Sequence, residues 1–309
     1  MRLLLLGCTG FIGKELIPAL LKEGHVLSII SRKNISNLEI SIPLDKCKFL
    51  KIDLSKKENW SDEGLLSNLK DSDGIINLIG EPIADKKWTE SQKEKIEKSR
   101  INSTKFLMET LKKYKINPKV IINGSAIGFY GTSLTKEFNE NSQSGDDFLA
   151  KLCNKWEEVA NEKPFFSRLV IFRIGIVIEA EGGALGKMLP IFKLGLGGPI
   201  GGGKQWMSWI HRSDLCGLII KALVEKKFTG VFNAVAPQPV LMRDFSKTLG
   251  RCLNRPDLLP VPGTILKLLL GDGAKLVLEG QKVISIKLQK IYKFKYPLLE
   301  KAIYASTKN

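Results

Sequence analysis

Short apolar runs alternate with helical patterns along the chain up to about residue 180. The runs predict β-strands at residues 2–6, 25–31, 49–53, 74–79, 120–123 and 169–174. Between them, apolar residues recur at helical spacing in residues 14–23, 89–114 and 147–161. Because strands that alternate with helices run parallel and are joined by crossover helices, we expect an α/β fold.

The pattern changes in the last third of the chain. Residues 181–205 are rich in glycine, and we expect them to form a loop over a site. A final strand signal at residues 231–236 precedes helical patterns at residues 242–253 and 263–270 and a mixed basic tail. Pro18 lies inside the first predicted helix, which it should kink or destabilise.

Composition narrows the class of protein. A chain of 309 residues with 43% hydrophobic and 26% charged residues is typical of a soluble globular protein with a large core. The apolar N-terminus is too short for a membrane span or a signal peptide, so we predict a cytoplasmic protein without a membrane span. Five cysteines without a CxxC pair and only two histidines, His25 and His211, predict neither disulfides nor a metal site.

The net charge of +16 raises the question of an acidic partner. Only nine of the 48 basic residues are arginine, and the lysines are spread along the chain without a motif that reads RNA or DNA. This distribution favours a solvated, lysine-rich surface over a specific nucleic-acid partner. Attraction to an anionic cofactor or substrate is compatible with either interpretation.

A glycine motif, Gly7-x-x-Gly10-x-x-Gly13, connects the first predicted strand to the first predicted helix. A dinucleotide-binding turn requires this context. Gly7 allows the sharp turn, Gly10 lets the backbone approach a pyrophosphate, and Gly13 lets the helix pack closely on the strand. The free N–H groups and the dipole at the helix N-terminus favour phosphate groups. The motif therefore predicts a dinucleotide cofactor.

The end of the second predicted strand indicates which nucleotide binds. NAD sites place an Asp or Glu there to bind the ribose 2′-hydroxyl, but this chain reads Ser31-Arg32-Lys33. Because a guanidinium can pair with a 2′-phosphate, Arg32 predicts NADP(H) rather than NAD(H). A plain surface Arg-Lys pair would leave the preference open. Asp53, at the end of the third strand, is placed to accept from the adenine amino group or to cap the next helix.

Several segments resemble the extended short-chain dehydrogenase/reductase superfamily, beginning with residues 7–13 and 76–83. Others narrow the resemblance to its atypical epimerase/dehydratase-like group, whose members are often labelled nucleoside-diphosphate-sugar epimerases or cell-division inhibitors. These segments are residues 87–89, 99–101, 125–131, 145–149, 182–185 and 205–211. The resemblance covers nearly the whole chain, and it is far more specific for the family than for the reaction.

The resemblance implies a Rossmann-like, doubly wound parallel sheet that binds NADP(H) in residues 1–235, and a smaller, mainly helical substrate-side domain in residues 236–309. It implies a small-molecule substrate, such as a nucleotide sugar or a carbonyl compound, and is compatible with an oligomer by analogy. Asn102 is expected to have a structural role behind the sheet. The residues expected to contact the cofactor are Gly7, Thr9, Gly10, Phe11, Ile12, Gly13, Arg32, Asp53, Leu78, Ile79 and Gly80.

The wider superfamily uses a Ser or Thr and a Tyr-x-x-x-Lys dyad, in which the lysine lowers the tyrosine pKa. Ser125 matches the serine and would orient the reacting oxygen. The helix predicted at residues 147–161 contains no tyrosine, and Leu149 and Cys153 stand at the two dyad positions. The chain's one Tyr-x-x-x-Lys sequence, Tyr304 to Lys308, lies in the last six residues, and we interpret it as coincidence.

Tyr130, five residues after Ser125, is the remaining candidate for a proton donor, with Lys151 or Lys155 to assist it. The alternative is a packed or substrate-facing aromatic residue with solvated lysines, which we favour because nothing in the sequence fixes their geometry.

Other candidate residues have structural alternatives. Cys153 could act as a nucleophile only with a lowered pKa, and a buried thiol is the favoured interpretation. A lone histidine such as His211 is more often structural than catalytic. Three tryptophans would either line a pocket or pack in the core: Trp88, Trp206 and Trp209.

The sequence supports two functions of different classes. The first is an NADP(H)-dependent reductase or epimerase in which hydride passes between the nicotinamide ring and a small molecule. The second is a non-catalytic, NADPH-responsive regulatory protein, linked to cell division by the family labels, which the loss of the dyad favours. A third function, a basic protein associated with nucleic acid, would require at least salt-dependent retention on DNA.

Overall fold

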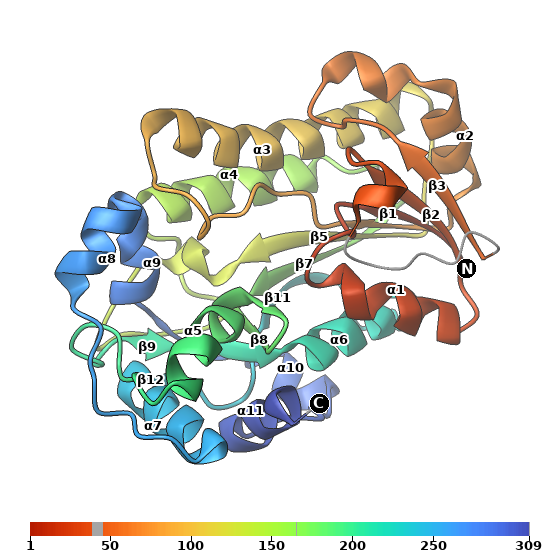
Figure 1. The fold of residues 1–309 in the computed structure, drawn as a ribbon. Helices are drawn as coiled ribbons and strands as arrows, with labels where there is room; N and C mark the ends of the chain where they lie inside the picture. Colours follow the sequence, from red (N-terminus) through yellow and green to blue (C-terminus); the bar gives the residue numbers. More distant parts are fainter. Residues whose placement is uncertain (39–45, 165, 309) are drawn as a thin grey trace.

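The computed structural model describes residues 1–38, 46–164 and 166–308. Its centre is a seven-stranded sheet in the order β11-β7-β5-β4-β1-β2-β3, in which all neighbouring strands are parallel (Figure 1). The predicted α/β fold with a doubly wound parallel sheet is confirmed. The strands are β1 (Arg2–Leu6), β2 (Val26–Ser31), β3 (Cys47–Lys51), β4 (Gly74–Asn77), β5 (Val120–Ala126), β7 (Arg168–Ile174) and β11 (Gly230–Ala234).

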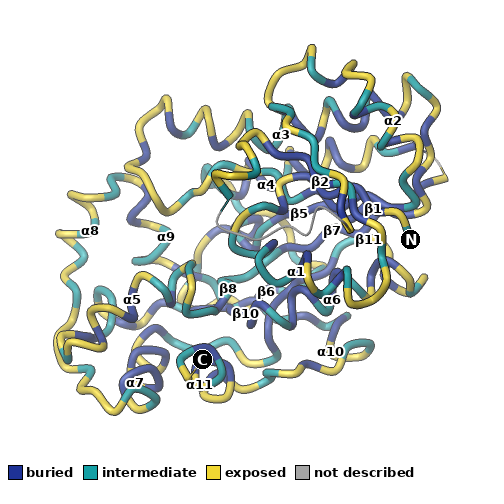
Figure 2. The backbone as a smooth tube through the Cα atoms, turned by 45° about the vertical axis from the view of Figure 1, so that its right-hand side comes forward, coloured by how far each residue is buried: buried dark blue, intermediate teal, exposed yellow. Residues whose placement is uncertain are grey.

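Helices cover both faces of the sheet (Figure 1). On one face lie α1 (Gly13–Lys22) and α6 (Arg212–Val224), and on the other lie α2 (Glu63–Asp71), α3 (Glu90–Lys113) and α4 (Phe148–Asn161). The central strands are therefore buried on both faces, as the backbone in Figure 2 shows. This burial explains why their sequences are continuous apolar runs rather than alternating patterns.

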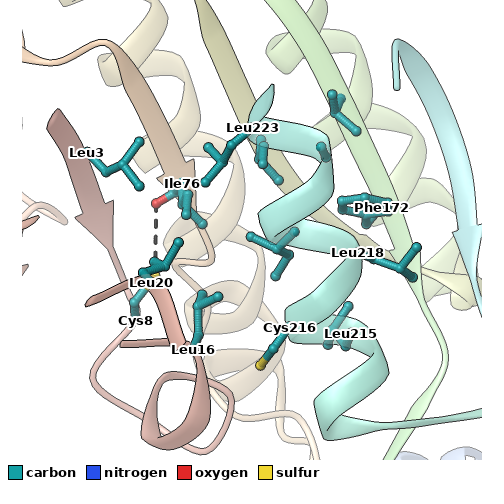
Figure 3. Close-up of a cluster of buried hydrophobic side chains, with 14 of the residues drawn as sticks. Leu3, Cys8, Leu16, Leu20, Ile76, Phe172, Leu215, Cys216, Leu218 and Leu223 are labelled. Carbon is teal, nitrogen blue, oxygen red and sulfur yellow. Dashed lines mark hydrogen bonds between the residues drawn. The ribbon is translucent and has the colours of Figure 1, made fainter. Parts of the chain in front are cut away.

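Hydrophobic clusters fill the space between the sheet and these helices. Figure 3 shows one of them, in which Leu16 and Leu20 of α1 and Leu215 of α6 share a cluster with Phe172 of β7. The side chains at helical spacing in α1 are thus the ones that face the sheet. The helix continues through Pro18, which lies on its solvent side.

The expectation of a loop over residues 181–205 is wrong for the first half of that segment. Residues Gly183–Lys193 form helix α5, directly after strand β8 (Ile176–Glu179), whereas residues 194–205 form the loop. The glycines on both sides of α5 led to the expectation of a loop, although the buried side chains of this helix recur three or four residues apart, as in an amphipathic helix. These side chains are Leu185, Met188, Leu189 and Phe192.

The C-terminal part of the chain is mainly helical. It contains α7 (Met242–Leu253), α8 (Gly263–Leu270), α9 (Lys275–Leu278), α10 (Leu288–Ile291) and α11 (Leu299–Thr307). One hydrophobic cluster combines side chains from both sides of residue 235, so a domain boundary at that residue stays a prediction. In the described part of the chain, no helix combines the length and the apolar character needed to cross a membrane.

Short strands connect this part to the rest of the molecule, since β9 (Trp206–Met207) pairs with β12 (Val240–Leu241) and β6 (Glu137–Phe138) pairs with β13 (Lys282–Val283). Before this part of the chain, β8 pairs with β10 (Trp209–His211). Short 3₁₀ helices lie at Ile35–Asn37, Lys57–Ser61, Ile127–Tyr130 and Asp272–Ala274.

The order of the strands creates a switch point at the centre of the sheet. From β1 the chain moves outward through β2 and β3, and it then returns to β4 on the other side of β1. Open α/β sheets bind ligands in the crevice beyond the carboxyl ends of such strands. The glycine motif directly follows β1 and therefore lies at this point.

Candidate functional site

The glycine turn has the geometry that its sequence predicts. Gly7 has a φ of +70°, and a Cβ on it would lie 2.6 Å from the Cα of Ile79. A Cβ on Gly13 would lie 1.5 Å from the carbonyl oxygen of Cys8, so this close packing requires glycine. A Cβ on Gly10 would meet no atom within 4 Å. The backbone at Gly10 therefore borders open space, as the approach of a phosphate requires.

The other residues expected near the cofactor gather around this turn. Leu78 follows β4, and its N–H donates to the carbonyl oxygen of Leu6 at 2.9 Å. Ile12 is the N-cap of α1. The ring of Phe11 lies against the backbone of Gly182, where a Cβ would be 2.8 Å from it. Contact of these residues with a cofactor stays a prediction.

The end of β2 places a guanidinium near the turn. Arg32 is exposed, and its Nη2 donates to Oε2 of Glu81 at 3.3 Å. The hydroxyls of Thr9 and Ser31 lie 3.3 Å apart and link the turn to the strand end. Partial burial opposes ionisation of Glu81, but the hydrogen bonds from Arg32 and Lys86 lower its pKa below the ordinary value.

Asp53 lies after β3 and bonds to its own loop. Its Oδ1 accepts from the N–H of Ser55 at 3.1 Å and from its hydroxyl at 2.7 Å. Partial burial opposes ionisation, but these hydrogen bonds and the charge of Arg32 lower the pKa of Asp53. The carboxylate stabilises this turn, and its contact with adenine stays a prediction.

The two candidate catalytic side chains belong to one buried network. Ser125 donates to Oε1 of Glu157 at 2.6 Å, and this oxygen also accepts from Nε of Arg173 at 2.9 Å. Arg173 donates through Nη2 to Oε2 of Glu157 at 2.8 Å and through Nη1 to the Tyr130 hydroxyl at 2.8 Å. Tyr130 in turn donates to Oδ1 of Asn233 at 2.7 Å. The register of the two parallel strands brings these side chains together, because Ser125 of β5 is the direct partner of Arg173 of β7.

This network occupies the two hydroxyls that catalysis would need. Ser125 is 3% exposed and Tyr130 is 2% exposed, and the proton of each is donated to a neighbouring side chain. Burial raises the pKa of Tyr130, although the nearby charge of Arg173 opposes the rise. Both side chains thus connect structural elements, and a catalytic role for either stays a prediction.

A cavity of about 700 Å³ lies beyond the carboxyl ends of β5 and β7. Its volume is within the range of small-molecule sites, roughly 300–1,000 Å³. Helix α4, the loop after β4 and residues 272–281 of the C-terminal part contribute to its walls. Much of the lining is apolar or aromatic, including Ile83, Trp88, Phe148, Leu149, Trp156, Trp206 and Leu276. Trp209 instead is fully buried in the core.

Leu149 and Cys153, which the sequence predicts at the two dyad positions of the wider superfamily, both line this cavity. Leu149 has no proton to transfer. Burial, with a contribution from Glu157, raises the pKa of Cys153 to about 12, so the thiol stays protonated at neutral pH and is a poor nucleophile. Lys151 and Lys155 are exposed on α4 and are not part of the cavity wall.

His211 has a structural environment at the start of α6. Its Nδ1 accepts from the N–H of Ser213 at 3.1 Å, so the ring proton lies on Nε2, which donates to the Ser306 hydroxyl at 3.2 Å. Its ring centroid lies 4.0 Å from that of Tyr296. Burial lowers the pKa of His211 to about 4, so the imidazole is neutral at pH 7.

Glu157, Arg173 and Asn233 belong to the network although no sequence pattern predicted them there. Arg173 lies inside an apolar strand, and Glu157 lies on the buried face of a helix. Because charged residues are rarely buried unless they are paired, these two positions could have indicated a buried ion pair. Arg100 of α3 also lines the cavity without having been expected there. Among residues 1–38, 46–164 and 166–308, no group of three or more His, Cys, Asp or Glu side chains could hold a metal ion.

Comparison with known proteins places the chain in a family. Residues 3–234 match the model of the NAD dependent epimerase/dehydratase family, and residues 261–305 match a domain of unknown function, DUF1731. The human epimerase family protein SDR39U1 is 36% identical over 308 residues, which are 98% of each chain. The chloroplastic SDR39U1 homolog of Arabidopsis thaliana is 38% identical over 302 residues, covering 97% of this chain and 84% of the plant protein.

Solved structures agree with this family assignment. The crystal structure of human SDR39U1 (isoform 2) with NADPH matches with a TM-score of 0.88 and 34% identity over 100% of both chains. The UDP-glucuronic acid 4-epimerase of Bacillus cereus shares the fold, with a TM-score of 0.76 and 19% identity over 99% of this chain and 98% of the enzyme. The chain belongs to the NAD-dependent epimerase/dehydratase family, as a relative of the epimerase family proteins named SDR39U1.

Proposed function

We propose that the chain binds NADP(H), in preference to NAD(H), at the switch point and exchanges hydride with a small molecule in the cavity. The observation that carries this proposal is the guanidinium of Arg32 beside the glycine turn, at a strand end where an NAD site has a carboxylate. A relative with 34% identity over the whole chain has been crystallised with NADPH, which supports the same cofactor here.

The residues around the turn fit a dinucleotide phosphate. The space beside Gly10 accommodates a close approach, and the dipole at the N-terminus of α1 favours a phosphate there. Arg32 would exchange its bond to Glu81 for a 2′-phosphate, since the Arg32 side chain is exposed and Lys86 would remain paired with Glu81 at 3.3 Å. When bound, the cofactor supplies a hydride donor or acceptor at its nicotinamide ring.

The cavity walls would hold the substrate and exclude water from it. The rings of Trp88 and Phe148 pack edge to face with their centroids 5.4 Å apart, and Leu149 lines the same cavity. Ser125 and Tyr130 remain the candidates for orienting the reacting oxygen and for donating a proton. Tyr130 borders the cavity, and its hydroxyl would have to leave Asn233 to act.

The second candidate function is an NADPH-responsive regulatory protein without turnover, for which the family labels suggest cell division. Leu149 and Cys153 on the cavity wall favour it, because neither can do the work of the tyrosine-lysine dyad. Carbonyl compounds and nucleotide sugars added to the NADPH-loaded protein separate the two candidates. Substrate-dependent oxidation of NADPH supports the enzyme, whereas stable NADPH with every compound supports the regulatory protein.

The cofactor proposal is tested by calorimetric titration with NADPH and NADH. We expect NADPH to bind about 10- to 100-fold more tightly, since hydrogen bonds to a charged group contribute about 1.5–3 kcal/mol. Arg32→Ala should remove this preference. Arg243→Ala, the control, removes an equally exposed arginine from α7 and should keep the preference. Equal affinity of the unaltered protein for both nucleotides would contradict the proposed preference.

We also propose a cytoplasmic location for this chain. None of the five cysteines forms a disulfide, and four of them are buried, which suits a reducing compartment. Fractionation of the source cells with an antibody to the protein would test this location.

A further inference from the structure

The cavity contains a guanidinium without a carboxylate partner. Arg100 is partly buried on α3 and lines the cavity. Its Nη1 donates to the carbonyl oxygens of Glu81 at 3.0 Å and Ile96 at 3.2 Å, and to the Ser99 hydroxyl at 3.5 Å. All three acceptors are neutral. Within the described part of the chain, no carboxylate forms an ion pair with Arg100.

The other edge of this guanidinium, formed by Nε and Nη2, makes no hydrogen bond to a described residue. Gly80 packs over the face of the guanidinium and not against this edge, since a Cβ there would lie closer to Cζ of Arg100 (2.8 Å) than to Nη2 (2.9 Å) or Nε (3.2 Å). The ring centroid of Trp156 lies 5.5 Å from Cζ. One edge therefore anchors the side chain to the backbone, and the second edge is held in place and open.

The open edge matches the geometry of a carboxylate. Nε and Nη2 are parallel donors that can pair with its two oxygens. The chain uses the same two atoms in its core, where Nε and Nη2 of Arg173 bind the oxygens of Glu157 at 2.9 and 2.8 Å. Burial lowers the pKa of Arg100, but a guanidinium stays charged at neutral pH. A partly desolvated charge is unfavourable without a counterion, and a bound anion would remove that cost.

The neighbouring cation on the cavity wall has a different environment. The ammonium of Lys93 lies 3.0 Å from Glu90 and 2.8 Å from Asp272, so carboxylates already neutralise it. The same wall also contains the apolar side chains of Trp88 and Phe148. On α3 the cavity wall thus has one cation without an ion pair, the Arg100 guanidinium, beside an apolar surface. The other charged side chains that line the cavity are Lys275, Asp146, Asp147, Asp272 and Glu279.

We propose that Arg100 is an anion-binding residue of the cavity, and that the ligand is a small organic acid. The carboxylate pairs with Nε and Nη2 of Arg100, and the apolar body of the acid lies against Trp88 and Phe148. The proposal names the substrate class of the proposed function and rests on it for the location of the site. Binding of the acid itself requires neither NADPH nor hydride transfer.

The test compares benzoate, phenylacetate and hexanoate with their primary amides, by calorimetry on the protein with and without NADPH. Each pair has nearly the same shape and differs in charge. We expect at least one acid to bind about tenfold more tightly than its amide, as a charged hydrogen-bonded pair predicts. Arg100→Gln should abolish this preference. Arg100→Lys should retain part of it, because lysine keeps the charge and loses the fork.

Lys93→Gln is the matched control, because it removes one positive charge from the same wall and should keep the preference for the acid. Equal binding of every acid and its amide would overturn the proposal, as would a preference that survives in Arg100→Gln. If Arg100→Gln fails to fold by circular dichroism, Arg100→Lys decides, and an unchanged preference in that variant overturns the proposal.

Two further outcomes separate this proposal from the proposed function. If Arg100→Gln loses NADPH affinity and the unaltered protein shows no preference for acids, the open edge serves the cofactor and the proposal is overturned. If the unaltered protein binds acids through Arg100 but binds no NADPH, the anion site stands and the proposed function fails.

Discussion

At the residue scale, the bidentate pair of Arg173 and Glu157 is expected to contribute strongly to stability. The two side chains are 5% and 6% exposed, and each compensates the charge of the other. Glu157→Gln keeps the shape of the side chain but leaves Arg173 with an unpaired buried charge. We expect the free energy of unfolding to fall by about 3–5 kcal/mol, measured by urea denaturation.

Glu158→Gln is the matched control for this change. It is the same substitution at the next position, where the exposed carboxylate bonds to Asn154 and Lys155. We expect a change within about 0.5 kcal/mol, as for most surface substitutions. A similar loss of stability in both variants would contradict a special role of the buried pair.

His211 gives the stability of the molecule a dependence on pH. Its pKa is lowered to about 4 in the folded chain, from 6.5 for an unperturbed histidine. Between these values the unfolded chain binds the proton more strongly, so stability falls as the pH drops from about 6.5 towards 4 and is retained above 6.5. The shift predicts a loss of about 2 kcal/mol between pH 7 and pH 5 from this residue.

The contribution of His211 is measured as a difference between two proteins. Urea denaturation at pH 7 and pH 5 should show a smaller loss of stability for His211→Asn than for the unaltered chain. The comparison cancels the titration of other groups. Equal losses in both proteins would mean that His211 does not titrate in this range.

Single residues of the site were predictable only where one local segment determines their environment. The glycine turn is such a case, because Gly7 and Gly13 lie within seven residues between one strand and one helix. The network of Ser125, Glu157 and Arg173 is not, because it depends on β5 and β7 being neighbours in the sheet. The pairing of distant strands is a tertiary property, and the spacing of residues along the chain does not contain it.

At the scale of elements, the turn between β1 and α1 permits a paired test of packing against binding. Gly13→Ala places a Cβ 1.5 Å from the Cys8 carbonyl oxygen, so we expect this variant to lose the native packing of α1. Gly10→Ala meets no atom within 4 Å, so we expect it to fold and to lose NADPH affinity by about tenfold or more, if the cofactor lies beside it.

Circular dichroism melting and NADPH titration of the two variants provide the measurement. Gly24→Ala is unsuitable as a control despite its open surroundings, because Gly24 has a φ of +74°. Gly202→Ala, which meets no atom within 4 Å and has no positive φ, should keep both stability and affinity. A Gly10→Ala variant with unchanged NADPH affinity would move the cofactor away from the turn.

Helices and strands were easiest to predict where apolar and polar residues are clearly separated in their sequences. The central strands are buried on both faces, and their apolar runs between polar segments identified them. Helix α6 has the opposite character, because buried residues occupy most of its surface and leave no clear polar face. Helix α5 was missed because glycines surround it, although its buried side chains have helical spacing.

At the scale of the whole molecule, the order of the strands determines where function is located. The first strands are added on one side of β1 and the later strands on its other side, which places the glycine turn at the switch point. The C-terminal part then forms one wall of the cavity through residues 272–281. A cofactor site from the first strands and a ligand site closed by the last third of the chain can therefore face each other in one molecule.

The net charge of +16 also acts on the whole molecule. Spread over a lysine-rich surface, it attracts polyanions without selecting among them. We expect duplex DNA to be retained equally for unrelated sequences at low salt. Its affinity should fall by about 10³-fold or more between about 50 and 200 mM NaCl, as for a protein that contacts 6–10 phosphates.

Fluorescence anisotropy with two unrelated labelled duplexes measures this loss, and NADPH titration at the same salt concentrations is the internal comparison. NADPH makes fewer phosphate contacts than duplex DNA and is also bound by the shape of the site, so its affinity should fall less. Retention of one duplex over the other at about 200 mM NaCl would mean that the basic surface reads sequence, since charge alone cannot distinguish two duplexes of equal length.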